Sequence, residues 1–461
     1  MAIAKSWAED EFGKANLGDA RRVQRLVQIA AAVEQEPAGK LTEVFAQDAA
    51  QREAGFRFME NDGVDAAEIA QASHLACARR AAEYDYVFVP TDGSSLNITD
   101  RKKGKSLGVV GSRSVGARGL EVMSSIAVSP DGVPLGICGQ VFWARVKASK
   151  RTGRHDRRRL DQKETQHWLT VMGQTRAALS AEAPKTKPWF QLDRGGDAWP
   201  VILEGLEPDQ LFTVRASYNR RLWEEDGHYL WNEVETSPVL GEYRLEVVGG
   251  PNRRARTATM EVRATMLTLL LQDEQSKRKY PATLFAVLAR EISPVPKEEK
   301  PLEWLLLTTH EVKTLEDARL VIFGYAQRWR IEQFHRAWKS GRCNVEETQL
   351  GTRDNIERWA TILAAVAVRI VRLTYLARHE EERPASLEFE PVEIKAVVLL
   401  REPKGFDRRK TPTVGQMVRW LADLGGYTGK SSGGPPGAIV IARGLDKIQS
   451  AVTVLRRSDQ W

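Results

Sequence analysis

The sequence predicts a mixed α/β fold with a helical region at each end. Residues 1–66 carry Ala-, Val- and Gln-rich helical stretches, the middle of the chain alternates short β-branched runs with helical ones, and the part after about residue 355 is helical again. Strands interleaved with helices are typical of an α/β sheet with mixed strand directions. We therefore expect a helical domain over 1–66, an α/β domain over 67–372 and a helical domain over 373–461.

The elements of the predicted sheet are short apolar runs that end at turn-forming residues. Tyr86–Val89 is expected to be a strand that ends at Pro90-Thr91-Asp92, and Trp189–Leu192 a buried strand that ends at Asp193. A hairpin is expected across Pro130-Asp131-Gly132, because Asp-Gly supplies the positive φ angles of a tight turn. The other elements predicted here are the hairpin strands Met123–Ser129 and Val133–Val141, the strands Leu211–Arg215 and Trp304–Leu307, and the helix Glu164–Ala183.

Residues from about 219 to 300 form a predicted β-rich insertion. Its expected strands are Tyr243–Val248, Thr257–Ala264 and Thr283–Leu288. A long helix then begins near Thr314, which makes a capping box with Asp317, and runs to about Ser340. The helical remainder is broken by a Gly-rich stretch over 425–437.

Composition and charge indicate the class of partner. The 461 residues carry a net charge of +7, which suits a polyanion. Nine basic residues lie between Arg145 and Lys163, so this stretch is either a solvated loop or a surface that follows phosphates. The best apolar run, Ile362–Val368, is far shorter than a membrane span, and the three cysteines are too far apart in the sequence for a disulfide framework or a zinc knuckle. We expect a protein of the cytoplasm with no membrane partner.

The long helix carries the most informative side chains. At about 100° per residue, four polar residues fall in one stripe about 60° wide, with apolar residues on the other side. These four are Tyr325, Arg328, Glu332 and Lys339. A buried helix would present a carboxylate flanked by two cations and a phenol. The alternative is an amphipathic helix whose solvent face carries Arg, Glu and Lys in salt-bridging register, although such a face seldom includes a tyrosine.

Two acids stand at the ends of predicted strands. Asp92 and Asp193 are expected to lie just beyond the carboxyl ends of their strands, where open α/β sheets form their functional crevice. Either residue could instead be a turn former or a helix cap. Together with Glu332 they supply three oxygen ligands, which suit Mg²⁺, and two such ions can serve phosphoryl transfer.

Seven motifs occur in an order and spacing that resemble the bacterial DDE cut-and-paste transposases of the insertion-sequence-four type, and among them the Tn5 type. They are Leu17-Gly-Asp-Ala-Arg-Arg, Arg57-Phe-Met-Glu-Asn, Asp92-Gly-Ser-Ser-Leu, Lys163-Glu-Thr-Gln-His-Trp, Asp193-Arg-Gly-Gly-Asp197, Trp304-Leu-Leu-Leu-Thr-Thr and Tyr325–Lys339. The Y-x2-R-x3-E-x6-K signature is highly specific, whereas the two Asp motifs are weak without it. The resemblance covers about residues 10–455.

The resemblance implies an RNase H-like catalytic core with a β-rich insertion between the second Asp and the Glu. It implies that Asp92, Asp193 and Glu332 are the catalytic, metal-binding triad, which holds two Mg²⁺ ions, with Mn²⁺ as a substitute. The residues that it assigns to phosphate or DNA contact are Tyr325, Arg328, Lys339, Arg336, Arg215, Arg220 and, in the N-terminal helix, Arg21, Arg22 and Arg25. Ser217 stands where the family has a lysine, which removes one expected phosphate contact.

Two further side chains have competing interpretations. Trp304 resembles the family tryptophan that stacks on a flipped base, yet a tryptophan on a buried strand is more often a core residue. His335, at the edge of the Glu332 stripe, is either a proton shuttle or phosphate ligand or a residue with a structural hydrogen bond.

The sequence thus predicts a Mg²⁺-dependent transposase that binds inverted terminal repeats and acts on double-stranded DNA as a homodimer in a synaptic complex. The expected reaction runs through strand nicking, hairpin formation, hairpin opening and strand transfer into target DNA. Two alternatives stay open: an RNase H-like nuclease that does not join strands, and a catalytically dead DNA-binding regulator derived from a transposase. The role of the basic segment Arg145–Arg159 is left open as well.

Overall fold

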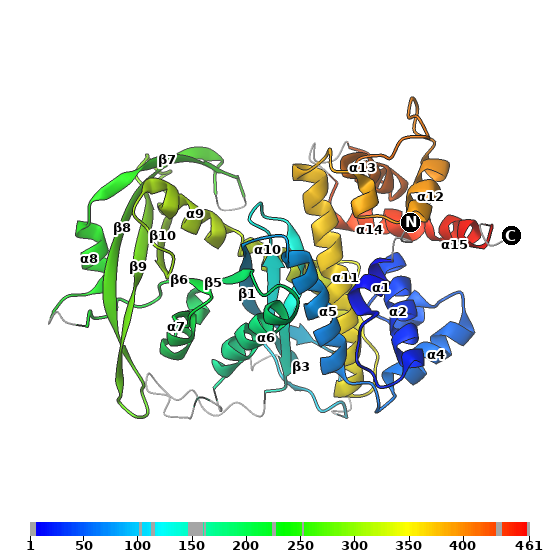
Figure 1. Ribbon diagram of the computed structural model, residues 1–461, viewed down its shortest axis with the longest axis horizontal. Helices are drawn as coiled ribbons and strands as arrows, with labels where there is room; N and C mark the ends of the chain where they lie inside the picture. The colour runs from blue at the N-terminus through cyan, green and yellow to red at the C-terminus, as the bar shows by residue number, and fades with distance from the viewer. Residues whose placement is uncertain are drawn as a thin grey trace.

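The computed structural model describes residues 6–100, 104–111, 116–145, 160, 163–223, 227–250, 253–429 and 436–458. The basic segment predicted over Arg145–Arg159 lies outside these ranges except for Arg145 itself. Within them, one long helix, α11 (Arg353–His379), separates a large sheet with its covering helices from two groups of terminal helices (Figure 1).

The N-terminal region is helical, as predicted. Its helices are α1 (Trp7–Phe12), α2 (Ala20–Gln35), α3 (Leu41–Val44) and α4 (Ala49–Met59), followed by α5 (Ala66–Ala81). Asp side chains begin three of them: Asp19 accepts from the backbone N–H of Arg21, Asp48 from that of Gln51, and Asp65 caps α5 in the same way. These carboxylates satisfy N–H groups that have no partner inside the helix.

The strands of the described residues form one mixed sheet. They are β1 (Tyr86–Asn97), β2 (Gly108–Val109), β3 (Arg118–Val128), β4 (Pro134–Trp143), β5 (Lys187–Leu192), β6 (Leu211–Arg215), β7 (Val239–Val247), β8 (Arg256–Gln272), β9 (Lys279–Glu291) and β10 (Glu303–Thr308). The order is β2-β3-β1-β5-β6-β10-β9-β8-β7, with β4 also paired to β3. β1, β5 and β6 run parallel, and the other paired strands are antiparallel.

This sheet confirms the predicted mixed α/β class and its hairpin, with two differences. The β-rich insertion is continuous with the rest of the sheet, because β10 pairs with β6 on one side and β9 on the other. The short strand predicted at Tyr86–Val89 is wrong in its length: β1 continues through Pro90 to Asn97. β3 pairs with the far half of β1 from Thr91 to Asn97, which keeps the chain extended.

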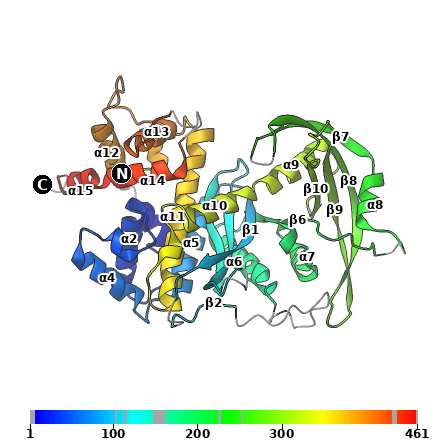
Figure 2. The same cartoon turned by 180° about the vertical axis from the view of Figure 1, so that it is seen from behind.

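Helices cover the sheet and join it to α11. They are α6 (Gln166–Glu182), the short 3₁₀ turn η2 (Arg194–Gly196), α7 (Trp199–Gly205), α8 (Leu230–Thr236), α9 (Leu315–Ala326) and α10 (Trp329–Lys339). The single helix predicted from Thr314 to Ser340 is wrong, because it is two helices with a break at Gln327–Arg328. Its predicted capping box of Thr314 and Asp317 is present. Figures 1 and 2 show α10 between β1 and α11.

The C-terminal region is also helical, as predicted. After η3 (Val345–Glu347) and α11 come η4 (Ala385–Leu387), α12 (Pro391–Arg401), α13 (Val414–Leu424), α14 (Ala438–Lys447) and α15 (Gln449–Ser458). The structure shows a longer apolar stretch than Ile362–Val368, because α11 is the one described helix long and apolar enough to cross a membrane. Since 78% of that stretch is buried inside the protein, α11 is placed as a core helix.

Candidate functional site

Asp92 and Asp193 are neighbours at the point where two parallel strands stop pairing. The ladder between β1 and β5 runs to Thr91 opposite Leu192, and the next residues of the chain are Asp92 and Asp193. Asp92 was expected beyond a strand end, but it lies within β1 because that strand continues along β3. Asp193 does follow the end of β5, where its carboxylate accepts from the backbone N–H of Gly195 at 2.7 Å and begins η2.

Arg328 connects Asp92 to Glu332. It lies at the break between α9 and α10, and its guanidinium reaches Asp92 Oδ2 at 3.1 Å and Glu332 Oε1 at 2.6 Å. Two contacts to one planar group bring the carboxylates of β1 and α10 to the same place. The side chain of Arg328 is 14% exposed, so these ion pairs are screened little by water.

The charges around Asp92, Asp193 and Glu332 favour the binding of a cation. Burial, and next the nearby Asp193 carboxylate, raise the pKa of Asp92 to about 6, while Arg328 opposes the rise. A carboxyl group that resists ionisation beside two other carboxylates gains from any bound positive charge. Within the described ranges, no three His, Cys, Asp or Glu side chains stand close enough to form a ready metal site, and the cation present between Asp92 and Glu332 is the guanidinium.

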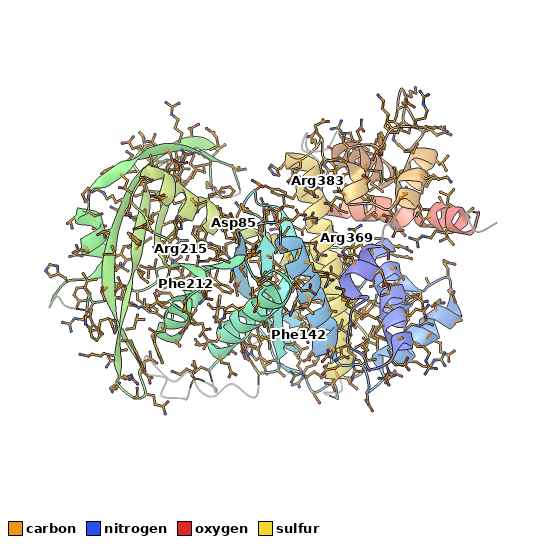
Figure 3. All side chains as sticks on the ribbon, in the orientation of Figure 1. Asp85, Phe142, Phe212, Arg215, Arg369 and Arg383 are labelled. Carbon is orange, nitrogen blue, oxygen red and sulfur yellow. The ribbon has the colours of Figure 1, made fainter. Side chains whose placement is uncertain are left out.

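Tyr325, in the last turn of α9, lies beside two residues of the neighbouring strands, Trp304 on β10 and Arg215 on β6. Tyr325 is 5% exposed, and burial raises the pKa of its phenol. The half-buried ring of Trp304 meets the Tyr325 ring edge-on, with 5.4 Å between the centroids. Arg215, on β6, donates to the carbonyl of Glu303 at 2.9 Å, and Figure 3 shows it in the sheet half of the molecule.

The remaining predicted side chains of α10 differ in exposure. Lys339 reaches Ser94 Oγ at 3.2 Å on β1 and Glu346 at 3.6 Å, and Arg336 is exposed. His335 is buried, and its Nε2 has no hydrogen-bond partner among the described residues. Burial, and next Lys339, lower the pKa of His335 to about 3, so the imidazole is neutral at physiological pH. Whether His335 serves as a proton shuttle, as a phosphate ligand or through a structural hydrogen bond stays a prediction.

Sequence reasoning missed Asp197, and it assigned its partner Arg220 to DNA. Asp197 is buried, and its carboxylate accepts from the backbone N–H groups of Ser217 and Tyr218 at 2.6 and 3.2 Å. Arg220 pairs with the same carboxylate at 2.6 Å and donates to the Asp197 carbonyl at 2.9 Å. The pair therefore ties the turn after Asp193 to the loop after β6. The spacing Asp193-x3-Asp197 was the signal available in the sequence.

The predicted arginines of α2 line an open cavity of about 400 Å³ between α2 and α4, but they do not share one role. Arg21 is 90% exposed and pairs with Asp19, and Arg25 donates to Gln51 at 2.6 Å. Arg22 instead donates to the carbonyls of Leu17 and Gly63, both at 3.0 Å, so it holds the domain together.

A fourth arginine completes this cavity. Arg57, on α4, lines it with an exposed side chain, and its ion pair with Glu53 is long, at 3.9 Å. Arg57 was quoted in a motif but was not assigned to DNA, because its distance in sequence from α2 hides that the two helices pack together.

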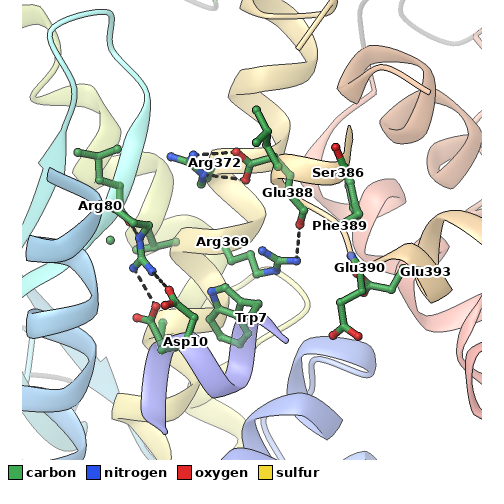
Figure 4. A pocket seen from close by; sticks show the side chains of 16 residues that line it. Trp7, Asp10, Arg80, Arg369, Arg372, Ser386, Glu388, Phe389, Glu390 and Glu393 are labelled. Carbon is green, nitrogen blue, oxygen red and sulfur yellow. Dashed lines mark hydrogen bonds and ion pairs between the residues drawn. The ribbon is translucent and has the colours of Figure 1, made fainter. Parts of the chain in front are cut away.

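A second polar cavity, of about 210 Å³, lies where the N- and C-terminal helices meet α11 (Figure 4). Arg80 pairs with Asp10 at 3.1 Å and Glu11 at 2.8 Å, and Arg372 pairs with Glu388 at 2.7 Å. Arg369 joins Glu34 of α2 to the Glu388 carbonyl. This cavity is a junction of domains, separate from Asp92 and Asp193.

Two family models match the ends of the chain. Residues 4–64 match the transposase DNA-binding domain, and residues 365–460 match the transposase Tn5 dimerisation domain. The chain is thus a transposase, with DNA as a partner and a homodimer as its supported assembly. More narrowly, these two domains identify it as a Tn5-like transposase.

Proposed function

We propose that this chain is a DDE transposase that binds inverted terminal repeats and carries out cut-and-paste transposition. Its reaction would be nicking at the transposon end, hairpin formation and opening, and strand transfer into target DNA. The observation that carries the proposal is the meeting of Asp92, Asp193 and the Arg328–Glu332 pair within a chain that has transposase domains at both ends.

We further propose that the central strands form an RNase H-like core. The strand order β4-β3-β1-β5-β6 supports this, with antiparallel pairing on one side of β1 and parallel pairing on the other. Asp92 and Asp193 come from the two central strands of that set. The β-rich strands β7–β9 follow in the sequence before α10, as an insertion between the second Asp and Glu332 requires.

We propose that these three carboxylates would hold two divalent cations, Mg²⁺ or in its place Mn²⁺, once Arg328 has moved. Asp92, Asp193 and Glu332 offer oxygen ligands, and the pKa of Asp92 is raised by burial and by the neighbouring Asp193 carboxylate, an effect that a bound cation would offset. When bound, such ions supply Lewis acidity to the phosphodiester and its attacking oxygen. Binding at all three carboxylates requires Arg328 to leave one of them.

The chain's own residues would position the DNA. Arg328, once released from Asp92 or Glu332, can pair with a backbone phosphate, and Lys339 and the exposed Arg336 lie further along the same helix. Trp304 and Tyr325 form an aromatic pair next to Arg215, on which an unstacked base could stack.

The test is incubation of the purified protein and Mg²⁺ with DNA that carries the inverted repeats flanking its gene. Products are mapped on a denaturing gel. We expect nicked, hairpin and joined products from the wild type, and none from Asp92→Asn with DNA binding retained. Asp85→Asn is the matched control, since Asp85 is exposed just before the same strand (Figure 3).

Three outcomes decide between the candidates. Cleavage that never leads to joining would favour the nuclease, and binding without cleavage would favour the regulator. Unchanged processing by Asp92→Asn would remove Asp92 from the mechanism.

A further inference from the structure

Three parts of the molecule meet at the tip of the β3–β4 hairpin. The tip, residues 129–134, is contacted by α11 and lies against the break between α9 and α10. The α11 residues involved lie within the segment that matches the dimerisation domain. The break carries Arg328, two residues before Arg330.

α11 holds the hairpin through two side chains one turn apart. Tyr375 donates its hydroxyl to the Asp131 carbonyl at 2.6 Å, and Arg372 donates to the Pro134 carbonyl at 2.9 Å. Residues three apart on a helix face the same side, so both reach the same loop.

Helix α10 also contacts Tyr375. The guanidinium of Arg330, in the first turn of α10, lies over the Tyr375 ring at 4.3 Å from the centroid. Cations attract aromatic faces at this distance, more strongly when both are shielded from water. His379, four residues further along α11, stacks on the Tyr375 ring with 4.3 Å between the centroids. The ring is therefore fixed from α10 and from its own helix.

Gly132 makes the close approach possible. Its φ is +89°, and a Cβ at this position would lie 2.7 Å from Tyr375 Oη and 2.9 Å from Gln327 Oε1. Gln327 is the last residue before Arg328, so the hairpin tip touches both Tyr375 and the break in the helix. A larger residue at position 132 would push the hairpin tip away from Tyr375 and from Gln327.

We propose that Arg330 and Tyr375 are positioning residues through which the dimerisation domain fixes the first turn of α10. They hold that turn so that Arg328 and Glu332 face Asp92. The inference rests on the proposed function of the Asp92–Asp193–Glu332 site. A displacement of α11, for example when two subunits associate, would therefore change the position of Arg328 and Glu332 through the Tyr375–Arg330 contact, in addition to the direct packing of α10 on α11.

The test separates positioning from stability. Tyr375→Leu and Arg330→Met should each lower kcat for cleavage of the end DNA about tenfold or more, with KM for that DNA and its binding affinity unchanged. The double variant should be no slower than the worse single variant, because both changes break one contact. Gly132→Ala should reproduce the loss. Arg419→Ala, an exposed arginine of α13 in the same domain, is the control and should cleave at the wild-type rate.

Conservative variants keep the test decisive if a larger change unfolds the protein. Tyr375→Phe keeps the ring under Arg330, so it should retain more activity than Tyr375→Leu, and Arg330→Lys should lose the planar stacking and with it part of kcat. Wild-type kcat in folded Tyr375→Leu, or in both conservative variants where Tyr375→Leu does not fold, overturns the inference. A wild type that binds DNA but never cleaves it refutes the proposed function instead.

Discussion

Two buried carboxyl groups in different parts of the molecule have raised pKa values for the same physical reasons. Asp92 and Glu393 both have a raised pKa, yet one faces the proposed catalytic site and the other lies in the junction of the terminal domains. Burial is the first cause in both cases, and a neighbouring carboxylate, Asp193 or Glu34, is the second. Such clusters are expected where a cation binds or where domains are joined.

Glu393 makes the free energy of unfolding depend on pH. Its pKa is raised to about 7 in the folded protein, so the neutral acid is favoured there and the stabilisation is present below the ordinary pKa. That stabilisation is lost as the pH rises through about 7. We expect Glu393→Gln to unfold at higher urea concentration than the wild type at pH 8, by about 3 kcal/mol, and to differ from it by less than about 1 kcal/mol at pH 5. Equal differences at both pH values would contradict this.

Divalent cations should stabilise the folded protein through Asp92. A ligand that binds only the folded state raises its stability by mass action, on the order of 3 kcal/mol at about one hundred times the dissociation constant. We expect millimolar Mg²⁺ to raise the Tm of the wild type and of Asp85→Asn, but not that of Asp92→Asn. A Tm rise of the same size in Asp92→Asn would mean that the cation binds elsewhere.

Among the elements, those with local turn signals were predicted and those shaped by tertiary contacts were not. The β3–β4 hairpin followed from Asp131-Gly132, whose glycine does adopt a positive φ. β1 was cut short because Pro90 normally ends a central strand. The structure tolerates it, since the ladder to β3 has no pairs at Val89 and Pro90 and resumes at Thr91.

The break between α9 and α10, at Gln327–Arg328, contains no proline or glycine from which it could be predicted. It tightens through i→i−3 hydrogen bonds, from Arg328 to Tyr325 and from Arg330 to Gln327, beside the hairpin tip. A periodic pattern cannot report such a contact. The stripe of Tyr325, Arg328, Glu332 and Lys339 was nevertheless a useful guide, because it singled out the side chains that the structure directs toward β1 and Trp304. The Asp197–Arg220 pair needed the fold to bring two loops together.

In the N-terminal element, Arg57 and Arg22 should behave differently. Arg57→Ala should lower the slope of log affinity against log salt concentration for duplex DNA by about 1, as expected for the loss of one phosphate contact, with Tm unchanged. Arg22→Ala should lower the Tm, because it frees the carbonyls of Leu17 and Gly63. Fluorescence anisotropy over a salt series measures the first effect. An unchanged slope in Arg57→Ala would exclude it from the DNA surface.

The loop after β5 should depend on its buried ion pair. Asp197→Ala leaves the guanidinium of Arg220 without its carboxylate, which typically costs about 3–5 kcal/mol. We expect a lower denaturation midpoint for Asp197→Ala, whereas Glu207→Ala, an exposed acid nearby, should match the wild type. A loss of less than about 1 kcal/mol would show that the pair behaves like a surface contact.

At the scale of the whole molecule, the C-terminal helices expose apolar side chains. Leu399 and Leu400 on α12 are 43% and 46% exposed, and Val454 on α15 is 65% exposed, within the match to the dimerisation domain. Exposed apolar groups of this kind are typical of interfaces.

We expect Leu399→Lys combined with Leu400→Glu to weaken the dimer at least tenfold, as measured by analytical ultracentrifugation. Val248→Lys, in the β-rich insertion, is the control, because Val248 is an even more exposed apolar residue, at 74%. An unchanged dimer would place the interface on other surfaces of the C-terminal region.

One helix carries the DNA-binding domain at its beginning and the dimerisation domain at its end. Arg358 donates to the carbonyls of Met59 and Val64, and Trp359 to that of Gly39, so the first turns of α11 are fastened to the N-terminal region. An α-helix advances about 1.5 Å and turns about 100° with each residue. We therefore expect the relative orientation of DNA bound by the two subunits of a dimer to depend on the length of α11, since one inserted residue would rotate the two ends of the helix relative to each other by more than a quarter of a circle.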